Sequence, residues 1–285
     1  MRAGRVSDGT QSIVAVQRDG EWFQVEAPDV SLLDVLATND RPPRLAAQPL
    51  PGEYRPAVPW RPARNVMCLG KNFPEHAIEF ATYNSEAEAV PTHPIVFTKA
   101  PESLCGAEDA IEVRHAVGSS LDYEAELAVM ISRDGEAITA ENALTHVAGY
   151  TIVNDITARD IQERHRQWFL GKSLPGATPI GPVVVTPDEL GEFGEVKITC
   201  HVNGELRQSA RLSEMIFSVA EAIAAISSIV PLRRGDLISM GTPSGVGIGF
   251  DPPRFLKDGD TLVCAIDGIG ELHNVIRLVS VEAGT

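Results

Sequence analysis

One stretch decides how this chain folds, Leu121-Asp122-Tyr123-Glu124-Ala125-Glu126-Leu127-Ala128-Val129-Met130-Ile131. Its acidic and apolar residues alternate, and a β-strand points successive side chains to opposite faces. The pattern therefore predicts a strand that carries Asp122, Glu124 and Glu126 on one face and apolar side chains on the other. Carboxylates crowded on one face repel each other unless a positive group lies among them.

A further acid, Asp155, ends a second apolar run about one strand later, in Asn154-Asp155. Oxygen ligands without Cys or His suit Mg²⁺, Mn²⁺ or Ca²⁺. The same residues also fit a solvated acidic strand face beside a helix cap at Asp155, and spacing alone slightly favours this second interpretation.

Composition describes an ordinary globular protein of 285 residues, with 39 acidic and 24 basic residues and a net charge of −15. Such a chain has no excess of cations to displace counterions from nucleic acid, so we expect no nucleic-acid partner. The four cysteines are far apart and form no CxxC pair, which indicates free thiols in a reducing cytoplasm. No apolar run approaches the ~18 residues of a membrane span, and the N-terminus lacks a signal peptide.

The first part of the chain predicts a small β-rich domain. Asp19-Gly20 lies between two apolar runs and favours a hairpin, and a short helix is expected over Leu32–Leu36. Residues 41–62 hold seven of the twenty prolines, so this segment should be extended. We therefore predict a small N-terminal domain with its linker over 1–62 and a larger domain over 63–285.

The remaining chain favours an α+β fold rich in strands. Strands are expected at 66–70, 95–97 and 183–185, and Asn203-Gly204 predicts a type I′ hairpin between two further strands. A capping box at Ser218 and Glu221 should open a helix that ends near Ile229. Strands mixed with irregularly spaced helices argue against a regular βαβ repeat.

Two pairs of polar residues have helical spacing. His76 and Glu79 are three residues apart on a helix that Pro74 should open, so Glu79 could orient and charge the imidazole as in a general base pair. Arg159 and Gln162 have the same spacing. Taken alone, an exposed ion pair and a salt-bridged helix explain these residues at least as well.

Two glycine motifs resemble nucleotide-binding loops but fail them. Gly171-Lys172-Ser173 lacks the glycine of a P-loop, because Arg166 stands at that position. Phe250 likewise follows Gly249 where the dinucleotide fingerprint needs glycine. The stretch Gly241-Thr242-Pro243-Ser244-Gly245-Val246-Gly247 predicts either a close backbone approach to a ligand or a tight turn.

Together these motifs resemble the fumarylacetoacetate hydrolase superfamily, in family order over roughly residues 64–280. The matching pieces are Gly70-Lys71-Asn72-Phe73-Pro74-Glu75-His76-Ala77-Ile78-Glu79, Asp122-Tyr123-Glu124-Ala125-Glu126-Leu127, Gly149-Tyr150-Thr151-Ile152-Val153-Asn154-Asp155-Ile156-Thr157-Ala158-Arg159-Asp160-Ile161-Gln162, Gly171-Lys172-Ser173, Ile180-Gly181-Pro182, and Gly235-Asp236-Leu237-Ile238 with the glycine-rich stretch after it. The resemblance implies a mixed β-sandwich roll, usually a homodimer, behind a small N-terminal domain.

The resemblance also implies a role for each matching residue. Glu124, Glu126 and Asp155 would bind Mg²⁺ (or Mn²⁺ or Ca²⁺). His76 and Glu79 would be the catalytic pair on a lid, with Lys172 as a third catalytic residue. Substrate contacts would come from Arg159, Gln162 and Thr242.

The expected activity is divalent-metal-dependent cleavage of a C–C bond in an acylpyruvate-like 2,4-diketo acid. Alternatives are an oxaloacetate-type decarboxylase, a 2-hydroxy-diene-dioate isomerase, and a metal-binding relative without catalysis. The chain departs from many relatives at Phe73, where tyrosine is common, and at Leu174-Pro175, where an aromatic residue and aspartate are common. The second departure suggests a less polar distal pocket that prefers an uncharged acyl tail.

Overall fold

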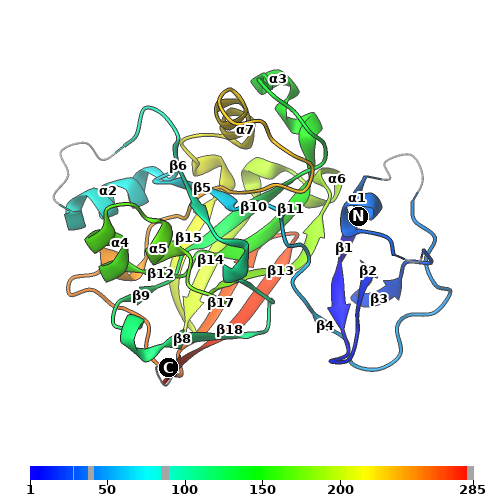
Figure 1. Ribbon diagram of the computed structural model, residues 1–285, viewed down its shortest axis with the longest axis horizontal. Helices are drawn as coiled ribbons and strands as arrows, with labels where there is room; N and C mark the ends of the chain where they lie inside the picture. Colours follow the sequence, from blue (N-terminus) through cyan, green and yellow to red (C-terminus); the bar gives the residue numbers. More distant parts are fainter. Residues whose placement is uncertain (28, 38–41, 85–89, 281–285) are drawn as a thin grey trace, which may run out of the picture.

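The computed structural model describes residues 1–27, 29–37, 42–84 and 90–280 (Figure 1). Its largest sheet has 11 strands, in the order β3-β2-β1-β13-β11-β10-β16-β5-β6, with β4 beside β1 and β7 beside β13. These strands are β1 (Arg2–Ser7), β2 (Ser12–Arg18), β3 (Glu21–Gln24), β4 (Arg55–Pro56), β5 (Val66–Gly70), β6 (Ile95–Lys99), β7 (Leu104–Cys105), β10 (Ala125–Ile131), β11 (Val147–Asn154), β13 (Thr178–Val185) and β16 (Leu237–Ser239).

A second sheet of five strands packs against the first through β14, β17 and β18. Its order is β15-β14-β17-β18-β8, with bounds β8 (Ala110–Arg114), β14 (Lys197–Val202), β15 (Glu205–Arg211), β17 (Thr261–Ile266) and β18 (Gly270–Val279). Two short strands, β9 (Leu121–Asp122) and β12 (Thr157–Ala158), form a separate two-stranded sheet. Parallel and antiparallel pairs occur in both large sheets. The predicted β-rich α+β fold, a mixed β-sandwich roll, is therefore confirmed.

Short helices surround the sheets. They are α1 (Leu32–Leu36), α2 (Pro74–Asn84), α3 (Ala140–Ala143), α4 (Arg159–His165), α5 (Phe169–Lys172), α6 (Pro187–Leu190) and α7 (Val219–Ser227). In Figure 1, α2, α4 and α5 lie together at one side of the body, away from the N-terminal strands. Within the described chain, no helix is long and apolar enough to span a bilayer.

Strand β10 is buried on both faces, which explains its near-continuous apolar sequence. Leu127 and Val129 belong to the core between the two sheets. Ala128 and Met130 belong to a second core on the opposite face of the large sheet. Glu126 has the parity of Ala128 and Met130, so the predicted alternation is confirmed from Ala125 to Ile131. The strand predicted over Leu121–Ile131 is interrupted after Asp122, which lies on β9 and pairs with β12, so Asp122 does not share one continuous strand face with Glu124 and Glu126.

Local predictions from turns and caps agree with the structure. Asp19-Gly20 joins β2 to β3, and Asn203-Gly204 joins β14 to β15 with positive φ at both residues, as a type I′ turn requires. Ser218 and Glu221 form the capping box of α7, which ends at Ser227, two residues before the predicted end. All four cysteines are free and buried, as expected.

The N-terminal strands continue the large sheet. Strand β1 pairs with β13 through Arg2 opposite Val185 and Ala3 opposite Val184. Helix α1 packs its leucines into the core on the same face as Ala128 and Met130. The domain boundary at residue 62 stays a prediction.

Candidate active site

Three acids converge because their strands are antiparallel neighbours. Ala125 at the start of β10 lies opposite Asn154 at the end of β11, and the amide of Asp155 donates to the carbonyl of Glu124 at 2.8 Å. One carboxylate oxygen from each of Glu124, Glu126 and Asp155 lies within 4.8 Å of the others. These side chains are at most 4% exposed, so the alternative of a solvated acidic face is wrong.

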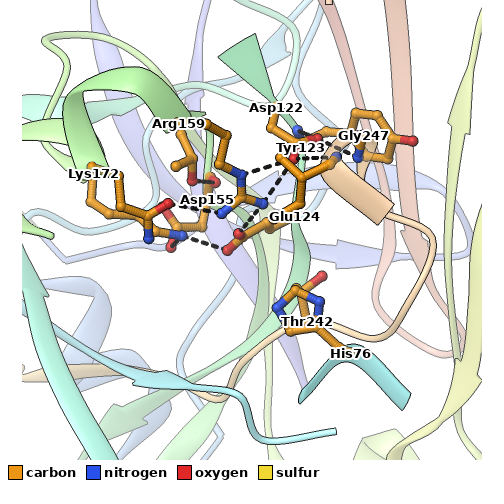
Figure 2. A network of polar contacts seen from close by, with 12 residues as sticks. His76, Asp122, Tyr123, Glu124, Asp155, Arg159, Lys172, Thr242 and Gly247 are labelled. Carbon is orange, nitrogen blue, oxygen red and sulfur yellow. Dashed lines mark hydrogen bonds and ion pairs between the residues drawn. The ribbon is translucent and has the colours of Figure 1, made fainter. Parts of the chain in front are cut away.

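Three buried cationic side chains form ion pairs with two of these acids. Lys172 Nζ lies 2.6 Å from Glu124 Oε2 and 2.8 Å from Asp155 Oδ2, and Lys99 Nζ lies 2.5 Å from Asp155 Oδ1. Arg159 Nη2 lies 2.6 Å from Glu124 Oε1. Figure 2 shows Lys172, Asp155, Arg159 and Glu124 joined by these contacts, with His76 below them.

The cations set the charge of Glu124. Burial raises its pKa, but Lys172 and Arg159 more than offset that effect, so the pKa of Glu124 lies below its usual range. Burial lowers the pKa of Lys172, but Asp155 and Glu124 outweigh it and raise the pKa overall. These groups therefore remain ionised at neutral pH.

Glu126 has a different environment. Its Oε2 accepts hydrogen bonds from Ser239 Oγ at 2.5 Å and from the amide of Gly241 at 3.1 Å. Burial, and then the charges of Asp155 and Glu124, raise the pKa of Glu126 above its usual range. A cation at this point would relieve that repulsion.

The donor set of the cluster fits a hard divalent ion. The buried cations Lys99, Lys172 and Arg159 contact Asp155, Glu124 and Asp122, whereas Glu126 makes no ion pair among the described residues. The donor atoms of the triad are all carboxylate oxygens, which Mg²⁺, Mn²⁺ and Ca²⁺ prefer. Glu124, Glu126 and Asp155 are thus the residues that could hold the ion.

Helix α2 brings His76 to the same cavity. His76 is 5% exposed, and its Nδ1 lies 3.2 Å from Glu79 Oε2, so these two residues are not an exposed helical ion pair. Glu79 Oε1 also accepts a hydrogen bond from the amide of Gly245 at 3.1 Å. The glycine-rich loop therefore orients the carboxylate that orients the imidazole.

The glycine-rich loop, residues 241–249, is a tight turn that also forms a wall of the site. A Cβ at Gly245, whose φ is +97°, would lie 1.9 Å from the carbonyl oxygen of Arg207, so only glycine fits. Thr242 Oγ1 donates to the carbonyl of Ala125 at 2.9 Å and accepts from Gln208 Nε2 at 2.8 Å. Its hydroxyl proton is already used, so Thr242 could offer a substrate only an oxygen lone pair or its backbone.

Arg159 and Gln162 share a face of α4, as their spacing predicted. Arg159 Nη1 donates to Gln162 Oε1 at 3.1 Å, and both side chains are buried. The alternative was a salt-bridged helix, and Arg159 does form ion pairs, but they go to the buried Asp122 and Glu124 rather than to a residue of its own helix. All nine residues that the sequence singled out lie in or beside one cluster, since eight border the site cavity or belong to the triad and Glu79 contacts His76.

The family follows from comparison with known proteins. Residues 65–277 match the family described as "Fumarylacetoacetate (FAA) hydrolase C-terminal". The chain belongs to this family. A relative from Bacillus subtilis (strain 168), "Oxaloacetate tautomerase YisK", is 51% identical over 216 residues, which are 76% of this chain and 70% of the relative.

Solved structures of the family have the same fold over the whole chain. The structure of "Fumarylacetoacetate hydrolase (EaFAH) from psychrophilic Exiguobacterium antarcticum" is 38% identical, with a TM-score of 0.86 and coverage of 98% of this chain and 100% of that one. A "2-hydroxyhepta-2,4-diene-1,7-dioate isomerase from Mycobacterium marinum" is 29% identical, with a TM-score of 0.78 and 98% of both chains covered. Similar members of the family thus bear the names of three kinds of enzyme, a tautomerase, a hydrolase and an isomerase.

The site cavity of this family member is narrow. Phe80 on α2 packs at a tilt against Trp168 with ring centroids 5.8 Å apart, and both line the cavity. The space left free is about 10 Å³, no more than one water molecule needs. A neighbouring cavity of about 460 Å³ shares Phe80, Trp168, Arg159 and Gln162 with it, so a substrate would need these walls to shift to reach the triad from that side.

Sequence reasoning missed several residues of the site. Lys99 contacts Asp155, Lys71 and Phe80 line the cavity, and Trp168 packs against Gly70 so closely that a Cβ there would lie 2.4 Å from its ring. No local pattern marks Lys99, which ends an ordinary strand.

Neither departure from the family pattern shapes the cavity as the sequence suggested. Leu174 packs into the core between the sheets and is not among the residues that line the site cavity, so the argument for an apolar distal pocket loses its basis. Phe73 is likewise a core residue, 2% exposed.

Proposed function

We propose that this protein is a divalent-metal-dependent enzyme that interconverts the keto and enol forms of a short 2-oxo dicarboxylic acid of the oxaloacetate type. Support comes from the 51% identical relative, whose name is that of an oxaloacetate tautomerase. The tautomerase proposal takes precedence over C–C hydrolysis because the sequence argument for an uncharged tail rested on Leu174-Pro175, and neither residue lines the site cavity.

The observation that carries the proposal is a base that faces an ion site. His76 Nδ1 is engaged with Glu79, which leaves Nε2 as the nitrogen that can take a proton. His76 lines the same cavity as Glu124, Glu126 and Lys172. A tautomerase needs this combination, because one proton must move between a carbon and an oxygen of the bound acid.

A divalent ion held by the triad would act as a Lewis acid on the oxygens of the 2-oxo acid. His76 Nε2 takes the proton from C3, the C3–H electron pair becomes the C2–C3 double bond, and the C2=O π electron pair moves onto the oxygen. Glu79 stabilises the resulting imidazolium, and Lys172 stabilises negative charge on the substrate. The proton then returns to the C2 oxygen, so enol forms with no net change of atoms.

Hydrolysis of an acylpyruvate is the second candidate. The same pair, His76 and Glu79, could instead deprotonate a water for attack on a distal carbonyl. A solved structure named for fumarylacetoacetate hydrolase is 38% identical to this chain. Hydrolysis needs room for that water, and the narrow cavity must open further to provide it.

One set of assays separates the candidates. The metal-loaded protein is given oxaloacetate enriched in the enol, and the approach to keto–enol equilibrium is followed by absorbance, with a chelated sample as control. Pyruvate release is measured from oxaloacetate and from acetylpyruvate with the same preparation. We expect fast, metal-dependent tautomerisation. Rapid pyruvate release from acetylpyruvate without tautomerisation would instead establish the hydrolase.

A further inference from the structure

Asp122 shares the acidic strand face of the sequence but does not join the metal triad. The strand is interrupted between β9 and β10, so Asp122 pairs with β12, and its carboxylate contacts Arg159 and the glycine-rich loop. Its side chain is fully buried. Asp122 Oδ2 accepts from Arg159 Nε at 2.9 Å and lies 2.8 Å from Arg159 Nη2.

The same carboxylate binds the glycine-rich loop. The amide of Gly247 donates to Asp122 Oδ1 at 2.6 Å, and the amide of Ile248 donates to Oδ2 at 3.1 Å (Figure 2). The amide of Tyr123 donates to Oδ1 at 2.9 Å as well. A buried carboxylate with this many donors is held firmly, because charge-assisted hydrogen bonds are roughly twice as strong as neutral ones.

The glycine-rich loop, which Asp122 holds, also contacts Glu79, the partner of the proposed base His76. Two residues before Gly247, the amide of Gly245 donates to Glu79 Oε1, and Glu79 Oε2 contacts His76. Gly249 lies so close to Glu79 that a Cβ there would be 1.7 Å from Glu79 Oε1. The position of Glu79 therefore depends on the position of the loop.

On its other side, Asp122 fixes Arg159. That guanidinium also contacts Glu124 of the triad at 2.6 Å and Gln162 at 3.1 Å. Asp122 thus lies between two parts of the site that come from distant segments of the chain, the loop that orients Glu79 and the arginine that contacts Glu124.

We propose that Asp122 is a positioning residue, which holds the catalytic base His76 and its partner Glu79 at a fixed position relative to the metal triad. It acts through the glycine-rich loop and Arg159 and touches neither ion nor substrate. The proposal rests on the proposed role of His76 as the base. It predicts that loss of the Asp122 charge displaces the loop and slows the proton transfer but leaves the ion in place.

The test is Asp122→Asn. The new amide nitrogen would face the donors of Ile248 and Arg159, so the loop should shift. We expect kcat to fall roughly 10- to 10²-fold, as for other small misplacements of a catalytic group, whereas the Mg²⁺ affinity measured by calorimetry stays close to that of the wild type. Hydrogen exchange at the amides of Gly245, Gly247 and Ile248 should accelerate.

Asp236→Asn is the matched control. Asp236 is 4% exposed, accepts from Arg64 Nε at 3.1 Å and from the amide of Arg233 at 2.7 Å, and does not line the site cavity. It should lower the melting temperature in a similar way without lowering kcat of the folded enzyme. Equal kcat in the two variants would overturn the proposal, and so would loss of Mg²⁺ binding in Asp122→Asn, which would make Asp122 a ligand.

A second variant covers the case in which Asp122→Asn does not fold. In Gly247→Ala the added Cβ would lie 2.6 Å from Asp122 Oδ1 and 2.7 Å from the carbonyl oxygen of Arg254, so the loop must move while Asp122 keeps Arg159. Unchanged kcat in that variant would also overturn the proposal. Hydrogen exchange and Mg²⁺ titration need no substrate, so they test Asp122 even if the protein proves not to be a tautomerase.

Discussion

The acid half and the base half of the site are attached to the protein in different ways. Glu124, Glu126 and Asp155 stand on or beside two neighbouring strands that are buried on both faces. His76 and Glu79 stand on α2, which is held on the glycine-rich loop by a few hydrogen bonds and by a small apolar cluster around Phe80. The acid half is part of the core, whereas the base half is a separate helix laid over it.

This difference indicates how the site divides its work. The strands make many buried contacts and cannot move without opening the core. The ion site should therefore exist before substrate binds. The cavity has room for about one water, so we expect α2, a separate helix laid over the strands, to move when the proposed 2-oxo acid enters. Variants of the two halves should therefore differ in size and kind of effect.

The largest effect should come from the acid half. In Glu126→Gln the triad loses one charged ligand, so Mg²⁺ binding should be lost. Turnover should fall by about 10³-fold, because the ion contributes several kcal/mol of charge stabilisation. Calorimetric titration with Mg²⁺ and the tautomerisation assay measure both. Glu112→Gln, an exposed change on β8, is the control and should alter neither. An unchanged Mg²⁺ isotherm in the Glu126 variant would contradict the metal site.

The base half should show a smaller loss with the ion retained. His76→Ala should lower kcat by ~10²-fold, the usual contribution of a positioned general base. Mg²⁺ affinity should not change, because His76 contacts Glu79 rather than the triad. The control is His273→Ala, which breaks another histidine–glutamate pair, His273 Nε2 with Glu271 Oε2 at 2.7 Å, whose side chains are both exposed on β18. Turnover that survives in the His76 variant would remove this residue from the mechanism.

The sequence predicted the acid half from local information. Period-two alternation places Glu124 and Glu126 on one face wherever the strand lies, and Asp155 follows the neighbouring apolar run. The pattern could not show burial, because a solvated and a buried acidic face have the same alternation. That distinction depends on the second core, which strands and α1 from the N-terminal region complete.

Asp122 and Lys99 show where local reasoning ends. Asp122 has the parity of Glu124, but the strand is interrupted after β9, and the carboxylate of Asp122 contacts the glycine-rich loop. Lys99 reaches Asp155 only because β6 and β11 belong to one sheet that non-consecutive strands assemble. Contacts between distant segments set both positions, and no spacing rule along the chain encodes them.

The smallest effect should come from the exposed end of the base half. Ser244 Oγ donates to Glu75 Oε2 at 3.0 Å, a second contact between the glycine-rich loop and α2. Ser244→Ala removes one exposed hydrogen bond, on the order of 0.5 kcal/mol, so KM should rise about twofold as α2 closes less readily. Hydrogen exchange in α2 should accelerate, and Mg²⁺ affinity and kcat should hold.

Ser228→Ala is the matched control, since Ser228 Oγ makes a similar exposed bond to the carbonyl of Ala225 at the end of α7. It should leave KM and the exchange of α2 unchanged. If Ser244→Ala instead lowers kcat as much as His76→Ala does, the loop organises the chemistry directly. The helix would then be as rigid as the strands, and the proposed division between a fixed acid half and a movable base half would fail.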